Sequence, residues 1–398
     1  MRKGIWIYPW DLMDEGIEAV LDKVQAIGLN TVNVAAAYHA GKFFLPHNPR
    51  HKVYFPEDGA LYFAPDLKRF KASGLEPRIS RLVADGDPLA QVTKAAQRRG
   101  LEAGAWVVAL HNSYMGERYP KYSVENLFGD RYVNSLCPSQ PKVRAYVLAL
   151  VGDLGKRYDL ASITVESSSF LAFDHGYHHE FFLTELGFTQ RQLLGLCFCS
   201  QCRRRAKKAG IDADSLRRAL KGDFNAEAEA RAASSIPAED DVFQFLDLVL
   251  RRPELAEFIR LRCSIVTEFV AELRQAAGRN LVVTGPIFTK PTAMGWVEGL
   301  DFAQLAKVAD HLIVISYYRD QDRVVSDFRY ALKLVGDPKK LEVAINAGLP
   351  ATVTPQDIEQ KVLMAKEYQV SGIGFYNYGH LPLRNLEWIR LALERHQP

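Results

Sequence analysis

Short apolar runs alternate along the chain with segments whose apolar residues repeat every three to four positions. The runs lie at 4–9, 31–38, 102–110, 161–166, 281–285, 311–318, 341–347 and 372–378. Their length and β-branched content predict strands, and the segments between them, such as 16–28 and 88–100, predict amphipathic helices. Eight strands that alternate with helices are typical of a (β/α)8 barrel. An open doubly wound sheet is disfavoured because no glycine-rich phosphate loop follows the first strand.

The chain is longer than a minimal barrel, and most of the extra residues lie in three loops. We expect one barrel domain over residues 1–398, with long loops after strands 2, 3 and 4. The longest of them, a helical insertion at 167–239, follows strand 4. All three loops follow the C-terminal ends of strands, which is the face where barrel enzymes place their active sites.

Composition and charge disfavour some classes of binding partner for this protein. The formal net charge of +3 and the single basic run RRRAKK at 203–208 disfavour nucleic acid as a partner. No apolar stretch has the length of a signal peptide's core or a membrane span, so we expect a cytoplasmic protein that does not bind membranes. The sequence is compatible with a homo-oligomer. Five cysteines in a reducing compartment favour metal binding or packing over disulfides.

Three of those cysteines are clustered in the segment LCFCSQC at 196–202. Cys197, Cys199 and Cys202 provide three ligands of a tetrahedral zinc site, and Cys137, on the loop after strand 3, is the best fourth. We therefore predict structural Zn²⁺ on four cysteines and no organic cofactor. Unligated thiols, or a site completed by a histidine, are the alternatives. Cys263 lies within a helical pattern and is expected to be an ordinary buried thiol.

The fragment HHE at 178–180, followed by C-x-x-C at 199–202, also matches part of the zinc-deaminase pattern H-x-E…C-x-x-C. However, Phe198 stands where that pattern has proline, and an eight-stranded barrel is a different setting. We interpret the cysteines as a brace for the long insertion, because structural zinc contributes on the order of 10 kcal/mol to folding.

Three segments together resemble the zinc-bearing β-galactosidases of glycoside hydrolase family 42. They are LCPSQP at 136–141, ITVES at 163–167 and CFCSQCRRRAKKAG at 197–210, so that the likeness covers roughly residues 130–210 and the barrel plan. The resemblance implies a zinc-holding cysteine cluster and a general acid/base at Glu166. It also implies a nucleophilic glutamate at the end of strand 7, where this sequence has Asn346. Strand 4 here also lacks the Asn-Glu pair, so β-galactosidase activity does not carry over.

Independently of this resemblance, the sequence around Glu166 also makes it the first catalytic candidate. Alternation along ITVES places Thr164 and Glu166 on the same side of strand 4, facing the barrel interior. Partial burial there would raise the pKa of the carboxyl toward the range of a general acid. The alternative is a structural glutamate paired with an arginine such as Arg319.

Glycoside hydrolysis usually requires a second carboxylate. Asp320 after strand 6 is the first choice, with Glu180 and Asp174 of the strand 4 loop as rivals and Asp11 behind them. Aromatic, amide and imidazole side chains at the strand ends suit sugar rings and hydroxyls. The predicted substrate-binding residues are Tyr8, Trp10, His39, His111, Asn112, His175, His178, Tyr317, Asn346, Tyr376 and Tyr378.

The sequence therefore predicts a hydrolase of O-glycosyl bonds that acts on an oligosaccharide or glycoside, or a transglycosidase. A metal-dependent barrel hydrolase that uses the region His178–Glu180 is one alternative. A carbohydrate-binding barrel without catalysis is the other, because Asn346 replaces the strand 7 glutamate.

Overall fold

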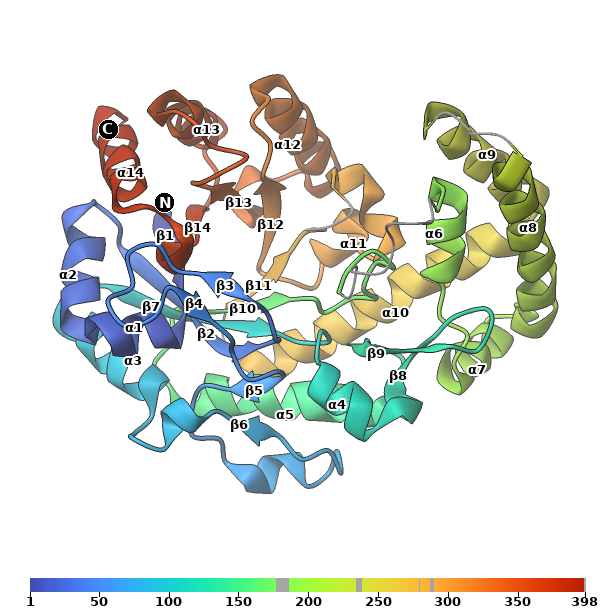
Figure 1. Ribbon diagram of the computed structural model, residues 1–398, viewed down its shortest axis with the longest axis horizontal. Coiled ribbons are helices and arrows are strands. Elements are labelled where there is room, and N and C mark those ends of the chain that lie inside the picture. Colours follow the sequence, from blue (N-terminus) through green and yellow to red (C-terminus); the bar gives the residue numbers. More distant parts are fainter. Residues whose placement is uncertain (177–185, 234–237, 279, 287–289, 397–398) are drawn as a thin grey trace.

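The computed structural model describes residues 1–176, 186–233, 238–278, 280–286 and 290–396 (Figure 1). Eight parallel strands form its centre. They are β1 (Arg2–Ile7), β2 (Thr31–Tyr38), β7 (Glu102–Val108), β10 (Ser162–Glu166), β11 (Leu281–Thr284), β12 (His311–Ser316), β13 (Leu341–Asn346) and β14 (Gly372–Tyr376). Each pairs with its neighbours in chain order, and β1 pairs with both β14 and β2. The strands thus close into a ring, which confirms the predicted (β/α)8 barrel.

Alternation along each strand divides the apolar residues between two cores. Residues such as Ile163 and Val165 of β10 face outward and join the large core between strands and helices. Inward-facing side chains such as Trp6 and Trp106 fill the barrel itself. Gly374 of β14 makes room for Trp6, because a Cβ there would lie 2.4 Å from the indole ring. Near the N-terminal ends of the strands, a cavity of about 10 Å³ remains beside Thr164 and Trp6.

The outer helices follow their strands as the pattern predicts. They include α2 (Ile17–Ala26), α3 (Pro88–Arg98), α5 (Pro141–Arg157), α10 (Pro253–Ala277), α12 (Gln321–Val335), α13 (Pro355–Glu367) and α14 (Leu383–Arg395). The start of α3 shows why a helix begins there: Asp87 accepts a hydrogen bond from the backbone N–H of Ala90, and Pro88 occupies the first helical position. Between β11 and β12, the described residues form the 3₁₀ helix η4 (Thr292–Val297) and the four-residue helix α11 (Phe302–Leu305) in place of a long outer helix.

Long excursions follow β1, β2 and β7 at the C-terminal end of the barrel. The helix α1 (Pro9–Glu15) follows β1 directly. The loop after β2 contains the hairpin of β3 (Phe43–Phe44) and β4 (Val53–Tyr54), and then β5 (Ala60–Leu61) and β6 (Arg78–Ile79), which extend from β2. The loop after β7 contains α4 (Ser113–Arg118) and the antiparallel pair β8 (Ser123–Glu125) and β9 (Arg131–Leu136).

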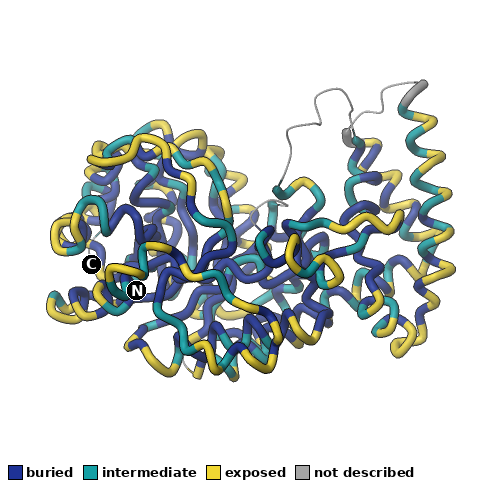
Figure 2. Tube along the Cα trace, turned by 60° about the horizontal axis from the view of Figure 1, so that its bottom comes forward, coloured by how far each residue is buried: buried dark blue, intermediate teal, exposed yellow. Residues whose placement is uncertain are grey.

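In the connection from β10 to α10, the described residues form four further helices, which are α6 (Phe188–Leu194), α7 (Ser200–Lys208), α8 (Ala213–Ala233) and α9 (Ala238–Arg251). They stand beside the barrel on the right of Figures 1 and 2. Their apolar faces form a separate core with Leu255 and Phe258 of α10. The insertion is thereby fixed to the barrel through a shared helix. Among the described residues, no helix is long and apolar enough to cross a membrane.

Candidate active site

Aromatic rings fill the C-terminal end of the barrel. Tyr8, which follows β1, is fully buried and lies between Trp10, stacked at 4.3 Å, and Trp106, at 5.5 Å. Its hydroxyl lies 2.9 Å from that of Tyr38 and 3.0 Å from that of Tyr376. The tyrosine hydroxyls therefore form a connected polar line through an otherwise aromatic layer.

Glu166 lies at the edge of this aromatic layer, at the last position of β10. Its Oε2 accepts a hydrogen bond of 2.9 Å from Nε1 of Trp106, which faces the barrel interior. The carboxyl group therefore points inward, and Thr164 two residues earlier lines the interior cavity, which confirms the predicted alternation. Arg319, the alternative partner, instead lies 4.0 Å from Asp357. Among the described residues, no cation forms a salt bridge with Glu166.

The environment of Glu166 shifts its proton equilibrium. Burial raises the pKa of this carboxyl from 4.5 to about 7, the Trp106 hydrogen bond lowers it in part, and the negative charge of Glu298 raises it further. The residue as a whole nevertheless retains some exposed surface at the barrel end. A carboxyl group that is half protonated near neutral pH can both donate and accept a proton.

The chain turns sharply directly after this carboxylate. Ser167 has a φ of 53°, in the left-handed region that residues other than glycine rarely adopt. The two residues that follow β7 hold the backbone at this turn, since Glu166 O accepts from Ala109 N at 2.9 Å and Ser167 O from Leu110 N at 3.0 Å. Strained backbone that the surrounding structure enforces is frequent at functional sites.

A second carboxylate lies near Glu166, and the sequence analysis did not identify it. Glu298 directly follows η4, is only 5% exposed, and is close enough for its charge to raise the pKa of Glu166. Its backbone O accepts a hydrogen bond of 3.0 Å from the N–H of Phe170, on the loop that follows β10. The end of β10 and the connection that follows the adjacent strand β11 thus contribute one carboxylate each.

Three of the predicted histidines come together from three different loops. His111 Nδ1 lies 2.7 Å from Nε2 of His175, and the ring of His39 stacks on that of His111 at 4.1 Å. Burial, and for His111 and His175 also the neighbouring imidazoles, lowers the pKa of all three rings. Uncharged imidazoles are suited to hydrogen bonding with hydroxyl groups.

Tyr317 and Tyr376 are the predicted tyrosines that retain exposed surface at the barrel end, with their ring centroids 5.8 Å apart. Phe43 of the β3–β4 hairpin and His380 stack at 5.2 Å above the buried Tyr8 and Trp10. The aromatic cluster therefore has an inner layer that is fully buried and an outer layer that is partly exposed.

Several other predicted residues have structural partners. Asn112 is buried and caps α4, where its Oδ1 accepts from Met115 N at 2.9 Å. Asn346 Oδ1 accepts from Gly348 N, also at 2.9 Å. Tyr378 is fully buried, and its hydroxyl donates to Glu15 at 2.8 Å, next to His47 rather than beside Glu166.

The predicted partner carboxylates lie in different surroundings from Glu298. Asp320 is exposed and caps α12, since its Oδ1 accepts from the backbone N–H groups of Asp322 and Arg323. Asp174 is exposed and pairs with Arg191. Asp11 is buried behind Tyr8 in α1, and burial raises the pKa of its carboxyl. Glu180 and His178 lie outside the described residues.

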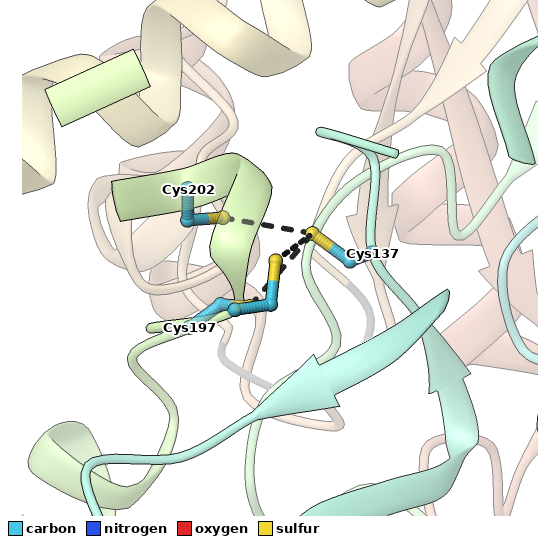
Figure 3. Close-up of side chains that lie close together, drawn as sticks. Cys137, Cys197 and Cys202 are labelled. Carbon is cyan, nitrogen blue, oxygen red and sulfur yellow. Dashed lines mark hydrogen bonds between the residues drawn. The ribbon is translucent and has the colours of Figure 1, made fainter. Parts of the chain in front are cut away.

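The four predicted cysteines form a compact group where the insertion meets the loop after β9, and Figure 3 labels Cys137, Cys197 and Cys202. Cys137 follows β9, Cys199 precedes the first turn of α7 and Cys202 lies within that helix; with Cys197 all four are buried. The sulfur of Cys137 lies 3.6 Å from that of Cys202 and 3.7 Å from those of Cys197 and Cys199. All four donor atoms lie within 4.8 Å of one another.

These separations fit a metal ion. Four sulfurs at about 2.3 Å from a tetrahedral Zn²⁺ lie about 3.8 Å apart, whereas a disulfide requires about 2.05 Å. Nearby groups orient the sulfurs, because Ser139 N donates to Cys137 and Nε2 of Gln140 donates to Cys199. Within the described part of the chain, this is the only group of three or more such donors drawn together in this way.

Trp106, Phe43 and Glu298 were not among the predicted site residues. The alternation of β7 offered a signal for Trp106, since it shares a face with Gly104 and Val108 and pairs in register with Thr164. The alternation of the β3–β4 hairpin is too short to be recognised in sequence. Glu298 stands in GWVEGL, 14 positions beyond β11, where no periodic pattern reaches.

No family model and no curated protein matches the sequence. The structure is similar to the PgaB (BpsB) glycoside hydrolase domain from Bordetella bronchiseptica, with a TM-score of 0.62, 11% identity and coverage of 98% of each chain. The β-amylase catalytic domain from Paenibacillus polymyxa gives a TM-score of 0.59 at 9% identity, over 100% of this chain and 99% of that one.

A β-galactosidase from the haloarchaeon Halorubrum lacusprofundi is similar at a TM-score of 0.59 and 13% identity. The match covers 99% of this chain but 58% of the galactosidase, so this chain spans little more than half of that relative. All three neighbours are glycoside hydrolases built on an eight-stranded parallel barrel. The predicted resemblance to barrel glycoside hydrolases is confirmed at the level of the fold.

Proposed function

We propose that this protein is a glycoside hydrolase, or a transglycosidase, with Glu166 as its general acid/base. The observation that supports this proposal is the carboxyl group of Glu166 itself. It stands at the C-terminal end of β10, has a pKa of about 7 and has Trp106 as its hydrogen-bond partner. A carboxylic acid with these properties can protonate the leaving oxygen of a glycosidic bond.

For the second carboxylate the structure favours Glu298 over the predicted Asp320. Glu298 is buried and its charge acts on Glu166, so its position is compatible with a paired acid and base. Asp320 is exposed and already accepts two backbone hydrogen bonds at the start of α12. The roles of the two can be separated by mutation.

The partly exposed rings of Tyr317, Tyr376 and Phe43 are the proposed stacking surface for sugar rings. His39 and the pair of His111 and His175 are the proposed partners of sugar hydroxyls. Tyr8 and Trp10 support this surface from the buried layer below it.

We also propose that the metal held by Cys137, Cys197, Cys199 and Cys202 is zinc, in a structural role. The set of four thiol donors is the one that structural zinc prefers, and it offers no open position for a reacting water. Burial raises the pKa of the Cys137 thiol, so a bound dication is needed to keep the group ionised. Zinc would then tie the start of α7 to the loop after β9.

The experiment is a screen of nitrophenyl glycosides and natural oligosaccharides with the full chain and four variants. We expect Glu166→Gln to lower kcat by about a hundredfold or more, because an amide cannot donate a proton to the leaving group. Glu298→Gln is expected to lower kcat as well, whereas Asp320→Asn is not. Glu342→Gln is the matched control, since Glu342 also lies on a barrel strand but pairs with Arg2.

Two outcomes would contradict the proposal. Turnover by Glu166→Gln at the rate of the unchanged protein would remove Glu166 from the chemistry. Glycan binding without any turnover would instead support the carbohydrate-binding alternative, which Asn346 at the end of β13 favours.

A further inference from the structure

Lys290 lies at the C-terminal end of the barrel, on the connection between β11 and β12. Its Nζ is 5.6 Å from the ring centroid of Tyr317 and 5.3 Å from that of Tyr318. Tyr317 belongs to the aromatic cluster in the barrel, whereas Tyr318 packs against the outer core. The ammonium group therefore sits over the rim of the barrel, on the side formed by the ends of β11 and β12.

The ammonium group of Lys290 is half-buried, and none of the carboxylates in the described part of the chain neutralises it. No acidic side chain of the described residues forms a salt bridge or hydrogen bond with it, and the charge that acts on it is that of Arg323, which is also positive. The guanidinium group of Arg323 lies over the same Tyr318 ring at 4.3 Å. Burial and Arg323 together lower the pKa of Lys290.

Two cations that share one tyrosine ring repel each other and lose hydration. The carboxylate of Asp327 offsets part of this repulsion, because it attracts the positive charge of Arg323. Asp327 also accepts a hydrogen bond of 2.8 Å from the backbone N–H of Thr292. A half-buried cation without a partner is unfavourable unless a ligand supplies the opposite charge. Carboxylate and sulfate groups are the anions that form strong charge-assisted hydrogen bonds with ammonium.

Tyr317 links this cation to the proposed catalytic group. The Tyr317 ring is near both Lys290, whose Nζ lies 5.6 Å from its centroid, and Tyr376, whose ring centroid is 5.8 Å away, and the charge of Glu166 raises the pKa of its hydroxyl. A sugar ring that stacks on Tyr317 would thus present substituents both to Glu166 and to Lys290. We propose that the site accepts acidic glycans, and that Lys290 binds a carboxylate or sulfate substituent of the sugar seated on Tyr317. This inference rests on the proposed function and specifies its substrate class.

The test uses three sets of probes, which are uronic-acid oligosaccharides, their methyl esters, and sulfated oligosaccharides of similar size. Dissociation constants are measured by calorimetry and turnover by release of reducing ends, both with the full chain. We expect the acid to bind at least about tenfold more tightly than its ester, and Lys290→Gln to remove that preference. Lys290→Arg should retain it. Lys307→Gln is the control, because Lys307 is an exposed lysine bonded to Gln304 on α11.

The relative affinity of uronate and sulfate probes identifies the anion. Equal binding of acid and ester, unchanged preference in Lys290→Gln, or no binding of any anionic probe would overturn the inference. Turnover of neutral glycosides that depends on Glu166 but shows no preference for acids would leave the proposed function standing without it. Acid-selective binding that depends on Lys290 without any turnover would support the anion site and refute the catalytic proposal.

Discussion

The replacement Glu166→Gln should stabilise the protein at alkaline pH while it lowers kcat by about a hundredfold or more. In the folded chain the pKa of Glu166 is about 7, against 4.5 for an ordinary glutamate, because the carboxyl group is largely removed from water. Between pH 4.5 and about pH 7, Glu166 is therefore protonated in the folded state and ionised in the unfolded state. The free energy of unfolding therefore falls as pH rises from about 4.5 to 7, and the stability that protonated Glu166 contributes is lost above pH 7.

The size of this effect follows from the same two pKa values. One pKa unit corresponds to about 1.4 kcal/mol, so ionised Glu166 costs the folded state at most about 3.5 kcal/mol. Because the residue as a whole retains some exposed surface, this figure is an upper bound. Unfolding entropy of about 2.1 cal/mol/K per residue over 398 residues converts it to a shift in Tm of up to about 4 °C.

The assay is differential scanning calorimetry of both proteins at pH 5 and pH 8.5. Glutamine resembles the protonated acid in shape and charge, so the two Tm values should differ little at pH 5. At pH 8.5 the variant should melt higher, by up to about 4 °C. Other titrating groups, such as the histidines, are common to both proteins and cancel in the comparison. An equal difference in Tm at the two pH values would refute the ionisation assigned to Glu166.

Further predictions concern the groups around this carboxyl and the cysteine cluster. Trp106→Phe removes the hydrogen bond that lowers the pKa of Glu166, so the alkaline limb of the pH–rate profile should move above pH 7; an unchanged limb would contradict the pairing. Metal analysis should find about one Zn per chain, and Cys199→Ser should lose both zinc and soluble protein, whereas Cys263→Ser should lose neither. A metal-free protein that melts cooperatively at the same temperature would argue against the zinc brace.

The barrel and the cysteine cluster could be predicted from sequence because both depend on short-range patterns. Strand runs such as 161–166 carry their own β-branched residues, and the order of eight of them leaves few topologies. Cys137 was paired with Cys197, Cys199 and Cys202 because loops after adjacent strands are neighbours in a barrel. The structure draws these four sulfurs together as that reasoning requires.

The details of the candidate site were less predictable because they depend on contacts between distant segments. Glu298 stands near Glu166 only because the loop beyond η4 returns to the loop after β10, where Phe170 N binds Glu298 O. No periodicity in sequence encodes such a return. Likewise, Asp320 looked like a second carboxylate from its place after β12, but whether such a residue faces the barrel or caps the next helix depends on the local backbone.

The position of Glu166, rather than its residue type, gives its carboxyl group a raised pKa. Val165, one position earlier on β10, faces the outer core, so a shift of one residue would place the carboxyl among helices. Glu342 lies on another strand of the same barrel, beside the cavity near the N-terminal ends of the strands, but it pairs with Arg2. At the opposite end of the barrel, Glu166 has an indole N–H as its partner and a second buried carboxylate nearby. An indole donor stabilises the ionised carboxyl without neutralising its charge, which leaves the group free to exchange a proton near neutral pH.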